Sequence, residues 1–281
     1  MNLETVIKDL AIRANIELRK DALSLLRYAF YREKASLAKE ALRVILENAK
    51  IARKERIAIC QDTGLPLVFL EAGRDIKIDK TLLDKIKKGV TKAYKEGGFR
   101  ASVIDSQGRL TYSGNFFHIE FTNTKGLKVT IFPKGFGSEN KTKMKMFNPT
   151  ASYDDIDKFI LEAVKEAGPG ACPPFFVGIG IGSTSEGCLV LAKKALLSPL
   201  DKPTPSKELV KWEKSLKEKI NALGIGPMGL GGRFSCLAVK IKRRPTHIAG
   251  LPVGVNISCH ALRSATLSIS KEELMDLLRN D

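Results

Sequence analysis

The chain has 281 residues and a formal net charge of +16 at pH 7, from 47 Lys and Arg against 31 Asp and Glu. A hydrophobic content of 43% and a charged content of 28% are typical of a globular protein, and no apolar run approaches the roughly 18 residues of a membrane span. Charges occur throughout Met1–Lys20, which argues against an export signal or an anchor. We therefore expect a cytoplasmic protein that does not associate with membranes.

The positive charge has more than one explanation. Nucleic acid is the first partner that such a balance suggests, but the Lys and Arg residues are dispersed and no aromatic-basic motif accompanies them, so we expect no nucleic-acid binding. An acidic partner subunit, a small polyanionic substrate or a thermophilic source, which a content of only two glutamines would fit, explain the charge as well. Composition does not separate these explanations.

The cysteines are odd in number and far apart in the sequence. Their spacing and the lack of an export signal argue against a disulfide framework, and the absence of a Cys-x-x-Cys pair argues against a zinc ribbon or a ferredoxin-type run. Any metal site must therefore be assembled from distant parts of the chain. The five residues are Cys60, Cys172, Cys188, Cys236 and Cys259.

The first half of the chain changes from helical to strand-like patterns. Helical periodicity predicts helices within 3–31, with a break near residue 21, and over 35–52 and 80–96. Residues 57–59 and 67–70 read as short strands, and the runs 116–121 and 127–132, separated by a turn, predict a hairpin. A polar loop over 134–141 follows, whose glycines let the backbone approach a ligand, although an ordinary turn has the same composition.

The second half mixes helices, buried strands and glycine-rich turns. The pattern predicts helices over 154–167, 183–197, 207–223 and 271–278, and strands over 175–181, 234–241 and 251–257. Gly178, Gly180 and Gly182 invite a dinucleotide-binding interpretation, but Ser183 stands where a third fingerprint glycine is needed, so we disfavour it. Together the elements predict a mixed α/β fold in a single domain over residues 1–281, with a helical N-terminal portion over 1–58.

Three cysteines share a context that the other two lack. Cys60 follows a predicted strand, Cys172 lies in a Gly-Pro-Gly-Ala-Cys-Pro-Pro turn, and Cys259 ends an apolar run. Ligands are commonly placed at such junctions of loops and regular structure. Cys188 and Cys236 lie among apolar neighbours within a predicted helix and strand, which favours a core position for both. From spacing alone, a three-thiolate site and coincidence both remain open.

Five signatures occur along the chain in a fixed order, and together they carry a family resemblance. The chain resembles the α (N-terminal) part of the iron-sulfur-dependent class I fumarate hydratases and of the related L-tartrate dehydratases, over nearly its whole length. The signatures are Cys60-Gln-Asp-Thr-Gly, the loop Lys134-Gly-Phe-Gly-Ser-Glu-Asn, Cys172-Pro-Pro with Gly178-Ile-Gly-Ile-Gly, Gly229-Leu-Gly-Gly, and His247 through Leu251-Pro-Val to Cys259-x-x-x-Arg263.

The resemblance implies a cofactor and its ligands. It implies a [4Fe-4S] cluster held by the thiolates of Cys60, Cys172 and Cys259, with one iron that lacks a protein ligand. That iron would act as a Lewis acid toward the substrate hydroxyl, and a base would remove the proton from the neighbouring carbon, without net electron transfer. The activity implied is the reversible hydration of fumarate to L-malate.

The resemblance also implies roles for individual residues. Asp62 and His247 are the candidates for acid-base or proton-relay work, although an isolated histidine like His247 would ordinarily be structural. The candidates for substrate binding are Gln61, Arg100 and the backbone N–H of Gly137, and a solvated surface arginine is the alternative for Arg100. Arg263 is expected to anchor the Cys259 loop, and His118 and His260 have no expected role. Phe136 and Ser183 depart from the family pattern and weaken any inference about the substrate.

The partners follow from the part of the family that the chain resembles. We expect a separate β subunit, an α2β2 heterotetramer and a small dicarboxylate substrate, with the catalytic base contributed by the β part. An L-tartrate dehydratase α subunit is the alternative enzyme. A non-enzymatic iron-sulfur redox or iron sensor could use the same three cysteines, but it would have no need of the motifs around Asp62 and His247.

Overall fold

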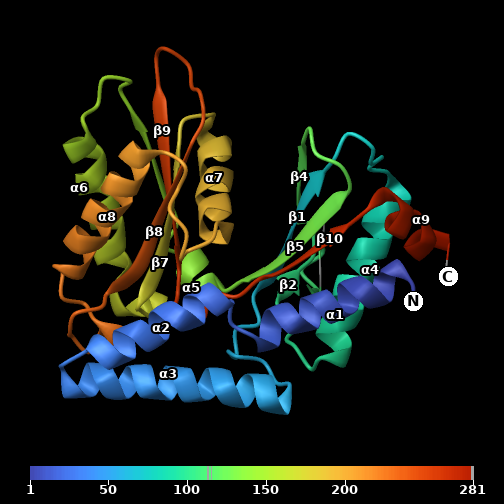
Figure 1. Ribbon diagram of the computed structural model, residues 1–281, viewed down its shortest axis with the longest axis horizontal. Helices are drawn as coiled ribbons and strands as arrows, with labels where there is room; N and C mark the ends of the chain where they lie inside the picture. The colour runs from blue at the N-terminus through green and yellow to red at the C-terminus, as the bar shows by residue number, and fades with distance from the viewer. Residues whose placement is uncertain (113, 115, 280–281) are drawn as a thin grey trace. The chain divides into compact units, whose positions relative to one another are not determined.

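A computed structural model describes residues 1–112, 114 and 116–279, and Figure 1 shows its ribbon. The chain divides into two compact units. Unit 1 comprises Met1–Arg19, Asn48–Gly135 and Arg263–Asp281, and unit 2 comprises Lys20–Glu47 and Phe136–Leu262. The expectation of a single domain over residues 1–281 stays a prediction, because compactness alone does not say whether either unit folds by itself.

Unit 1 is built on a four-stranded sheet with the order β10-β5-β1-β4. β1 runs antiparallel to β5 and parallel to β4, and β10 pairs antiparallel with the other edge of β5. A separate pair is formed by β2 and β3. The bounds are β1 Leu65–Ala72, β2 Val103–Ile104, β3 Leu110–Thr111, β4 Phe117–Phe121, β5 Leu127–Lys134 and β10 Ala265–Ile269.

The predicted hairpin over 116–132 is wrong, although both of its strands exist. β4 and β5 do not pair with each other, because β1 lies between them and pairs with both. β1 is buried along most of its length, and a buried strand needs partners on both edges for its backbone N–H and C=O groups. The alternation of side chains identified the strands but did not reveal this partner.

The helices of unit 1 pack close to one another and to the sheet. α1 (Leu3–Ile16) crosses α4 (Lys80–Glu96) at Gly89, where a Cβ atom would lie 2.7 Å from the carbonyl oxygen of Glu4. α1 also contacts β5 and β10, and α9 (Lys271–Arg279) contacts α1. The apolar side chains of these helices and of β1 and β5 form one core.

Unit 2 has its own four-stranded sheet, with the order β6-β9-β7-β8. β7 is parallel to β8 and antiparallel to β9, and all of its residues are buried. β6 covers the other edge of β9 in antiparallel pairing. The bounds are β6 Lys143–Phe147, β7 Phe175–Ile181, β8 Cys236–Arg243 and β9 Leu251–Ser258.

The glycines of β7 have a packing role. They face α7 (Ser185–Leu197), which runs along the sheet in Figure 1. A Cβ atom at Gly178 would lie 2.1 Å from the carbonyl oxygen of Ala192, and one at Gly180 would lie 2.0 Å from that of Cys188. Only glycine leaves room for the α7 backbone to approach so closely. The strand-glycine-helix pattern is therefore explained without a dinucleotide.

The other face of β7 is covered by α6 (Tyr153–Ala167) and α8 (Lys207–Asn221), which contribute to the second core. Trp212 of α8 is buried in that core and donates a hydrogen bond from Nε1 to Asp157 of α6 over 2.6 Å. α6 begins with a capping box between Ser152 and Asp155. The remaining elements are α2 Lys20–Arg32, α3 Ser36–Glu55, α5 Phe136–Glu139, and the short 3-10 helices η1 Gly168–Ala171 and η2 Pro227–Gly229.

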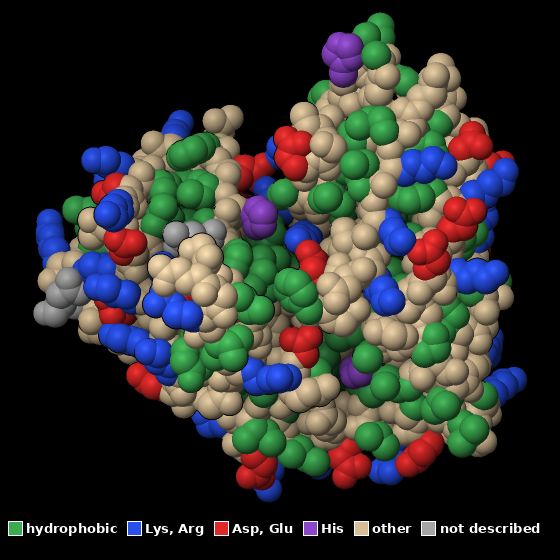
Figure 2. All heavy atoms as spheres, turned by 180° about the vertical axis from the view of Figure 1, so that it is seen from behind, with side chains coloured by type: hydrophobic (Ala, Val, Ile, Leu, Met, Phe, Trp, Pro, Cys, Tyr) green, Lys and Arg blue, Asp and Glu red, His purple; other side chains and the backbone are tan. Residues whose placement is uncertain are grey.

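The mixed α/β fold class predicted from the sequence is confirmed. Within residues 1–112, 114 and 116–279, no helix combines the length and apolarity that a membrane crossing requires. On the face that Figure 2 shows, Lys and Arg side chains are scattered among acidic and apolar ones and are not gathered into one area. A continuous basic surface, which would be typical of a nucleic-acid-binding protein, is not seen on that face.

Candidate functional site

The segment that leads to Cys60 is irregular, so the predicted strand over 57–59 is wrong. α3 ends at Glu55, and Ile59 then donates its N–H to the carbonyl oxygen of Asn15 over 3.1 Å. The carbonyl oxygen of Ile59 accepts a 2.8 Å hydrogen bond from the side chain of Asn48. Polar groups from α1 and α3 thus satisfy the backbone that a neighbouring strand would otherwise satisfy.

Residues 60–64, which we call the Asp62 loop, place the candidate carboxylate against the end of β5. Asp62 accepts the N–H of Gly64 at Oδ1 over 3.0 Å, which is an Asx turn. Gly64 has φ +74, and a Cβ there would lie 2.8 Å from the backbone nitrogen of Lys134. A Cβ at Gly135 would lie 3.2 Å from Asp62 Oδ2. Gly64 therefore lets the loop backbone approach the end of β5, and Gly135 leaves room for the carboxylate.

The other predicted residues of unit 1 lie on or beside the Asp62 loop. The Cys60 thiol donates to the side-chain oxygen of Gln61 over 3.3 Å, and Cys60 is half-buried while Gln61 is exposed. Arg100 donates its backbone N–H to Thr63 Oγ1 over 3.1 Å, and its side chain is exposed. Unit 1 thus brings together four predicted residues: Cys60, Gln61, Asp62 and Arg100.

The backbone of the Asp62 loop is held from the inside of unit 1 by two side chains that the motifs did not single out for this purpose. Tyr94 donates its hydroxyl to the carbonyl oxygens of Thr63 and Gly64, over 2.9 and 3.2 Å. Arg263, which we expected to anchor the Cys259 loop, donates from Nη2 to the carbonyl oxygen of Asp62 over 2.5 Å. Burial raises the pKa of Tyr94 to about 12.

Unit 2 brings Cys172 and Cys259 to the same end of its sheet. Cys172 ends η1 in a left-handed conformation, with φ 50, just before β7, and Cys259 directly follows β9. The carbonyl oxygen of Cys172 accepts the backbone N–H of His260 over 3.1 Å and lies 3.1 Å from His260 Nδ1. Because a carbonyl oxygen only accepts, Nδ1 must carry the proton. His260, which had no role from the sequence, therefore joins the two cysteine loops.

Gly137 lies near this cysteine end. It belongs to α5, and a Cβ at this position would lie 3.8 Å from the carbonyl oxygen of Gly170 in η1. Glu139 fastens α5 to its surroundings, through Lys193 over 2.5 Å and the buried side chain of Asn256 over 2.8 Å. The polar loop predicted over 134–141 thus contains one helical turn that is braced against α7 and β9.

His247 lies at the opposite end of the unit 2 sheet. It is exposed in the loop between β8 and β9, and its Nδ1 accepts the N–H of Ala249 over 3.1 Å. Cys259 follows the far end of β9, whose eight residues span about 26 Å at the usual rise of a strand. Figure 1 shows β9 as a long strand. A catalytic role for His247 stays a prediction.

The remaining two cysteines are core residues, as the sequence predicted. Both are buried, Cys188 in α7 and Cys236 in β8. Burial disfavours the thiolate, and it raises the pKa of Cys188 to about 11 and that of Cys236 to about 12. Neither thiol is suited to act as a metal ligand, because a ligand must ionise.

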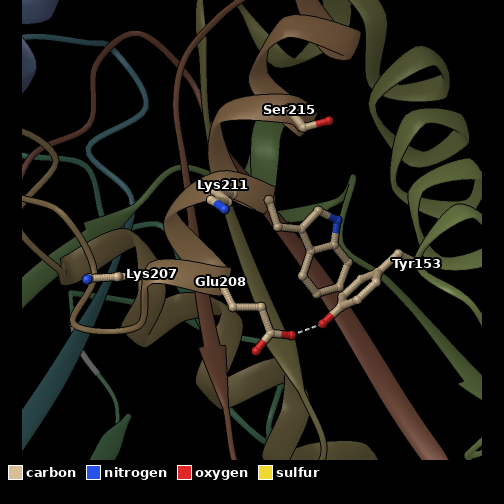
Figure 3. A pocket seen from close by; sticks show the side chains of 6 residues that line it. Tyr153, Lys207, Glu208, Lys211 and Ser215 are labelled. Carbon is tan, nitrogen blue, oxygen red and sulfur yellow. Dashed lines mark hydrogen bonds between the residues drawn. The ribbon is translucent and has the colours of Figure 1, made fainter.

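A surface cavity of about 480 Å³ lies between α6 and α8 (Figure 3). Tyr153 donates its hydroxyl to Glu208, and Arg243 contacts both, so these polar groups satisfy one another. None of the described lining residues comes from a predicted motif, and we assign the cavity no part in the site. The lining residues are Tyr153, Lys207, Glu208, Lys211, Trp212 and Ser215.

Within the described ranges, no three His, Cys, Asp or Glu side chains lie close enough together to share a single metal ion. The two cysteines of unit 2 that could act as ligands are half-buried, and a hydrogen-bonded loop pair already holds them at one end of the sheet. Thiolates are the donors by which proteins hold iron-sulfur clusters.

Comparisons with known proteins agree with the motifs. The family model described as fumarate hydratase (Fumerase) matches residues 4–268. A Methanocaldococcus jannaschii protein, provisionally named L(+)-tartrate dehydratase subunit alpha, is 40% identical over 94% of this chain and 96% of its own length. The L(+)-tartrate dehydratase subunit alpha of Escherichia coli K12 is 26% identical over 95% of this chain and 90% of its own length. The chain therefore belongs to the fumarate hydratase (Fumerase) family.

Proposed function

We propose that the chain is the α subunit of an iron-sulfur hydro-lyase that adds water to, or removes water from, a four-carbon dicarboxylate. Family membership supports the reaction class. The observation that carries the proposal furthest is the pairing of the Cys172 and Cys259 loops through His260, with both thiols half-buried, while Cys188 and Cys236 are sealed in the core.

The proposed cofactor is a [4Fe-4S] cluster held by the thiolates of Cys60, Cys172 and Cys259. Three thiolates suit such a cluster, because they leave one of its four irons without a protein ligand. When bound, the cluster would supply a Lewis acid that favours departure of the substrate hydroxyl. The part-exposed position of all three thiols supports this assignment, because a ligand must be reached by iron and must lose its proton.

Asp62 is the residue that we propose to hold and move a proton. Its Oδ1 is oriented by the N–H of Gly64, and the missing side chain at Gly135 leaves space beside Oδ2. A carboxylate in a fixed rotamer can transfer a proton along one direction, which is what general acid-base catalysis requires. Arg100 and Gln61 are exposed beside the same loop, and we propose that they bind a substrate carboxylate and hydroxyl. Gly137 and His247 remain weaker candidates.

The proposed partner is a separate β subunit, since the relatives carry the name subunit alpha. An α2β2 assembly and a base contributed by β belong to the same proposal. Two substrates remain candidates. The family description favours fumarate and L-malate, whereas the names of the relatives favour L(+)-tartrate.

The test is a reconstituted enzyme. The chain is loaded anaerobically with iron and sulfide, combined with its β subunit, and supplied with L-malate or L(+)-tartrate while fumarate or oxaloacetate is followed. We expect turnover of one of them, loss of the cluster in Cys60→Ser, and retention of iron in the control Cys188→Ala. Asp62→Asn should keep its iron and lose turnover by at least about a hundredfold, within the usual contribution of a general acid-base residue. A loaded complex that is stable but turns over neither substrate would contradict the proposed reaction and favour a redox or iron sensor.

A further inference from the structure

The Asp62 loop has no regular secondary structure, and apart from its Asx turn its geometry depends on groups outside it. Residues 60–64 form the last part of the connection from α3 to β1 and have no strand pairing of their own. Thr63 and Gly64 are nevertheless buried, and a buried carbonyl group needs a donor. The donors must therefore come from side chains that reach into the interior of unit 1.

Tyr94 supplies one of these donors from the buried face of α4. Its side chain is 1% exposed, and its ring packs edge-on against Phe99 with the ring centroids 5.4 Å apart. The hydroxyl is shared between the carbonyl oxygens of Thr63 and Gly64, over 2.9 and 3.2 Å. The high pKa of Tyr94, caused by burial, keeps the phenol protonated at every physiological pH, so this donor is permanent.

Arg263 supplies the second donor, at the carbonyl oxygen of Asp62 itself. The side chain is 3% exposed, its Nη2 contacts that oxygen over 2.5 Å, and its Nε has no hydrogen-bond partner within the described residues. Burying a guanidinium is costly, and a well-packed apolar side chain at such a position is often as stabilising or more so. A contribution to stability therefore explains poorly why an arginine is buried at position 263. Its hydrogen bond to the Asp62 backbone explains it directly.

We propose that Tyr94 and Arg263 are positioning residues that clamp the backbone of the Asp62 loop and thereby aim the Asp62 carboxylate. The inference rests on the proposed role of Asp62. The two donors hold three consecutive carbonyl groups, those of Asp62, Thr63 and Gly64. Gly64 N–H in turn orients Asp62 Oδ1. A shift of the loop by about 1 Å would be passed directly to the carboxylate, and misplacement of this size costs about a hundredfold in rate.

The first experiment uses Tyr94→Phe in the loaded complex with the β subunit. The substitution keeps the ring and its packing and removes the hydroxyl. We expect kcat to fall by about tenfold to a hundredfold, with KM within about twofold and the iron content unchanged. Val90→Ala is the matched control, because Val90 lies one turn earlier on the buried side of α4 and its loss destabilises the unit without touching the loop. It should lower the melting temperature and leave kcat and KM unchanged.

The second experiment measures the clamp without activity. Hydrogen exchange in the cluster-free chain should quicken selectively at the N–H groups of Gly64 and Arg100 in Tyr94→Phe, because both bond to the loop. Arg263→Met should have the same effect, and Arg263→Lys, which keeps a cationic donor, should restore slow exchange in part. If Arg263→Met does not fold, the Tyr94→Phe comparison decides alone.

The outcomes separate this inference from the proposed function. If the Asp62→Asn enzyme turns over substrate like the unmodified enzyme, the proposed catalytic role of Asp62 is wrong. The proposal that Tyr94 and Arg263 orient Asp62 for catalysis is then wrong as well. If Asp62→Asn is inactive but Tyr94→Phe matches Val90→Ala in kcat and in exchange at Gly64, the clamp is wrong and the proposed function stands.

Discussion

The five thiols should separate into two classes when the cluster-free chain is treated with a thiol reagent. Cys60, Cys172 and Cys259 are half-buried, whereas Cys188 and Cys236 are fully buried. We expect the first three to react rapidly at pH 8 and the last two to react only when the chain unfolds. The division matters because the proposed ligands must be both reachable and ionisable, and the core thiols should be neither.

The size of the difference follows from the pKa values. At pH 8, a thiol with a pKa of about 11 is ionised to about one part in a thousand, and one with a pKa of about 12 to about one part in ten thousand. An ordinary thiol, with a pKa near 8.5, is ionised to about a quarter. Ionisation alone therefore slows Cys188 and Cys236 by more than a hundredfold, before the lack of access is considered.

The assay counts the labels on the chain by mass spectrometry over time and maps them by peptide. Three labels should appear in the fast phase, and all five in urea. Fast labelling of Cys188 or Cys236 without denaturant would refute this reasoning, as would slow labelling of any of the other three. A related effect concerns stability: the unfolded thiols ionise from about pH 8.5, below the raised pKa values of the folded chain, so the unfolding free energy should fall as the pH rises from there.

Two further pairs of substitutions test the packing of β7 and the joining of the cysteine loops. Gly180→Ala places a Cβ 2.0 Å from the carbonyl oxygen of Cys188 and should lower the unfolding free energy by about 3 kcal/mol or more, measured by urea unfolding. Gly224→Ala, at φ +66 with open space around it, should cost about 1 kcal/mol, and an equal loss for both would contradict the packing argument. His260→Ala should release the loaded cluster to a chelator about tenfold faster, as loss of a group that orients a metal ligand does. The amide of His260→Asn can donate to the Cys172 carbonyl from the position of Nδ1, so this variant should release the cluster at the unmodified rate. If His260→Ala also releases it at the unmodified rate, His260 does not have this role.

The sequence predicted individual elements well and their partners poorly. α4 has the predicted bounds because its signals are local: Asp79 caps the N-terminus by accepting the N–H of Leu82 over 3.0 Å, and Gly97 ends the helix. The hairpin was wrong because strand pairing is not local. β1 carries the signal of a strand buried on both sides, but nothing in its residues says that β4 and β5 are the neighbours on either edge.

The same contrast holds for the candidate site. The residues of the motifs were visible because they share spacing and residue type with a known family. The roles of Tyr94 and His260 were not visible in the sequence. Each side chain bonds to a backbone carbonyl oxygen, and every residue has such an oxygen, so the partner leaves no mark on the sequence. The available signals were weak: a hydroxyl on the apolar face of α4 for Tyr94, and a position directly after Cys259 for His260.

The Asp62 loop is constrained from both sides, and the two constraints have different chemistry. On the β5 side, Gly64 and Gly135 exclude side chains, so the backbone and the carboxylate can lie against the strand end. On the inner side, Tyr94 and Arg263 supply donors that fix the carbonyl groups. A loop needed only to connect α3 to β1 would require neither, because a connection tolerates several conformations. A carboxylate that must transfer a proton in one direction needs a single loop conformation, and both constraints favour that conformation.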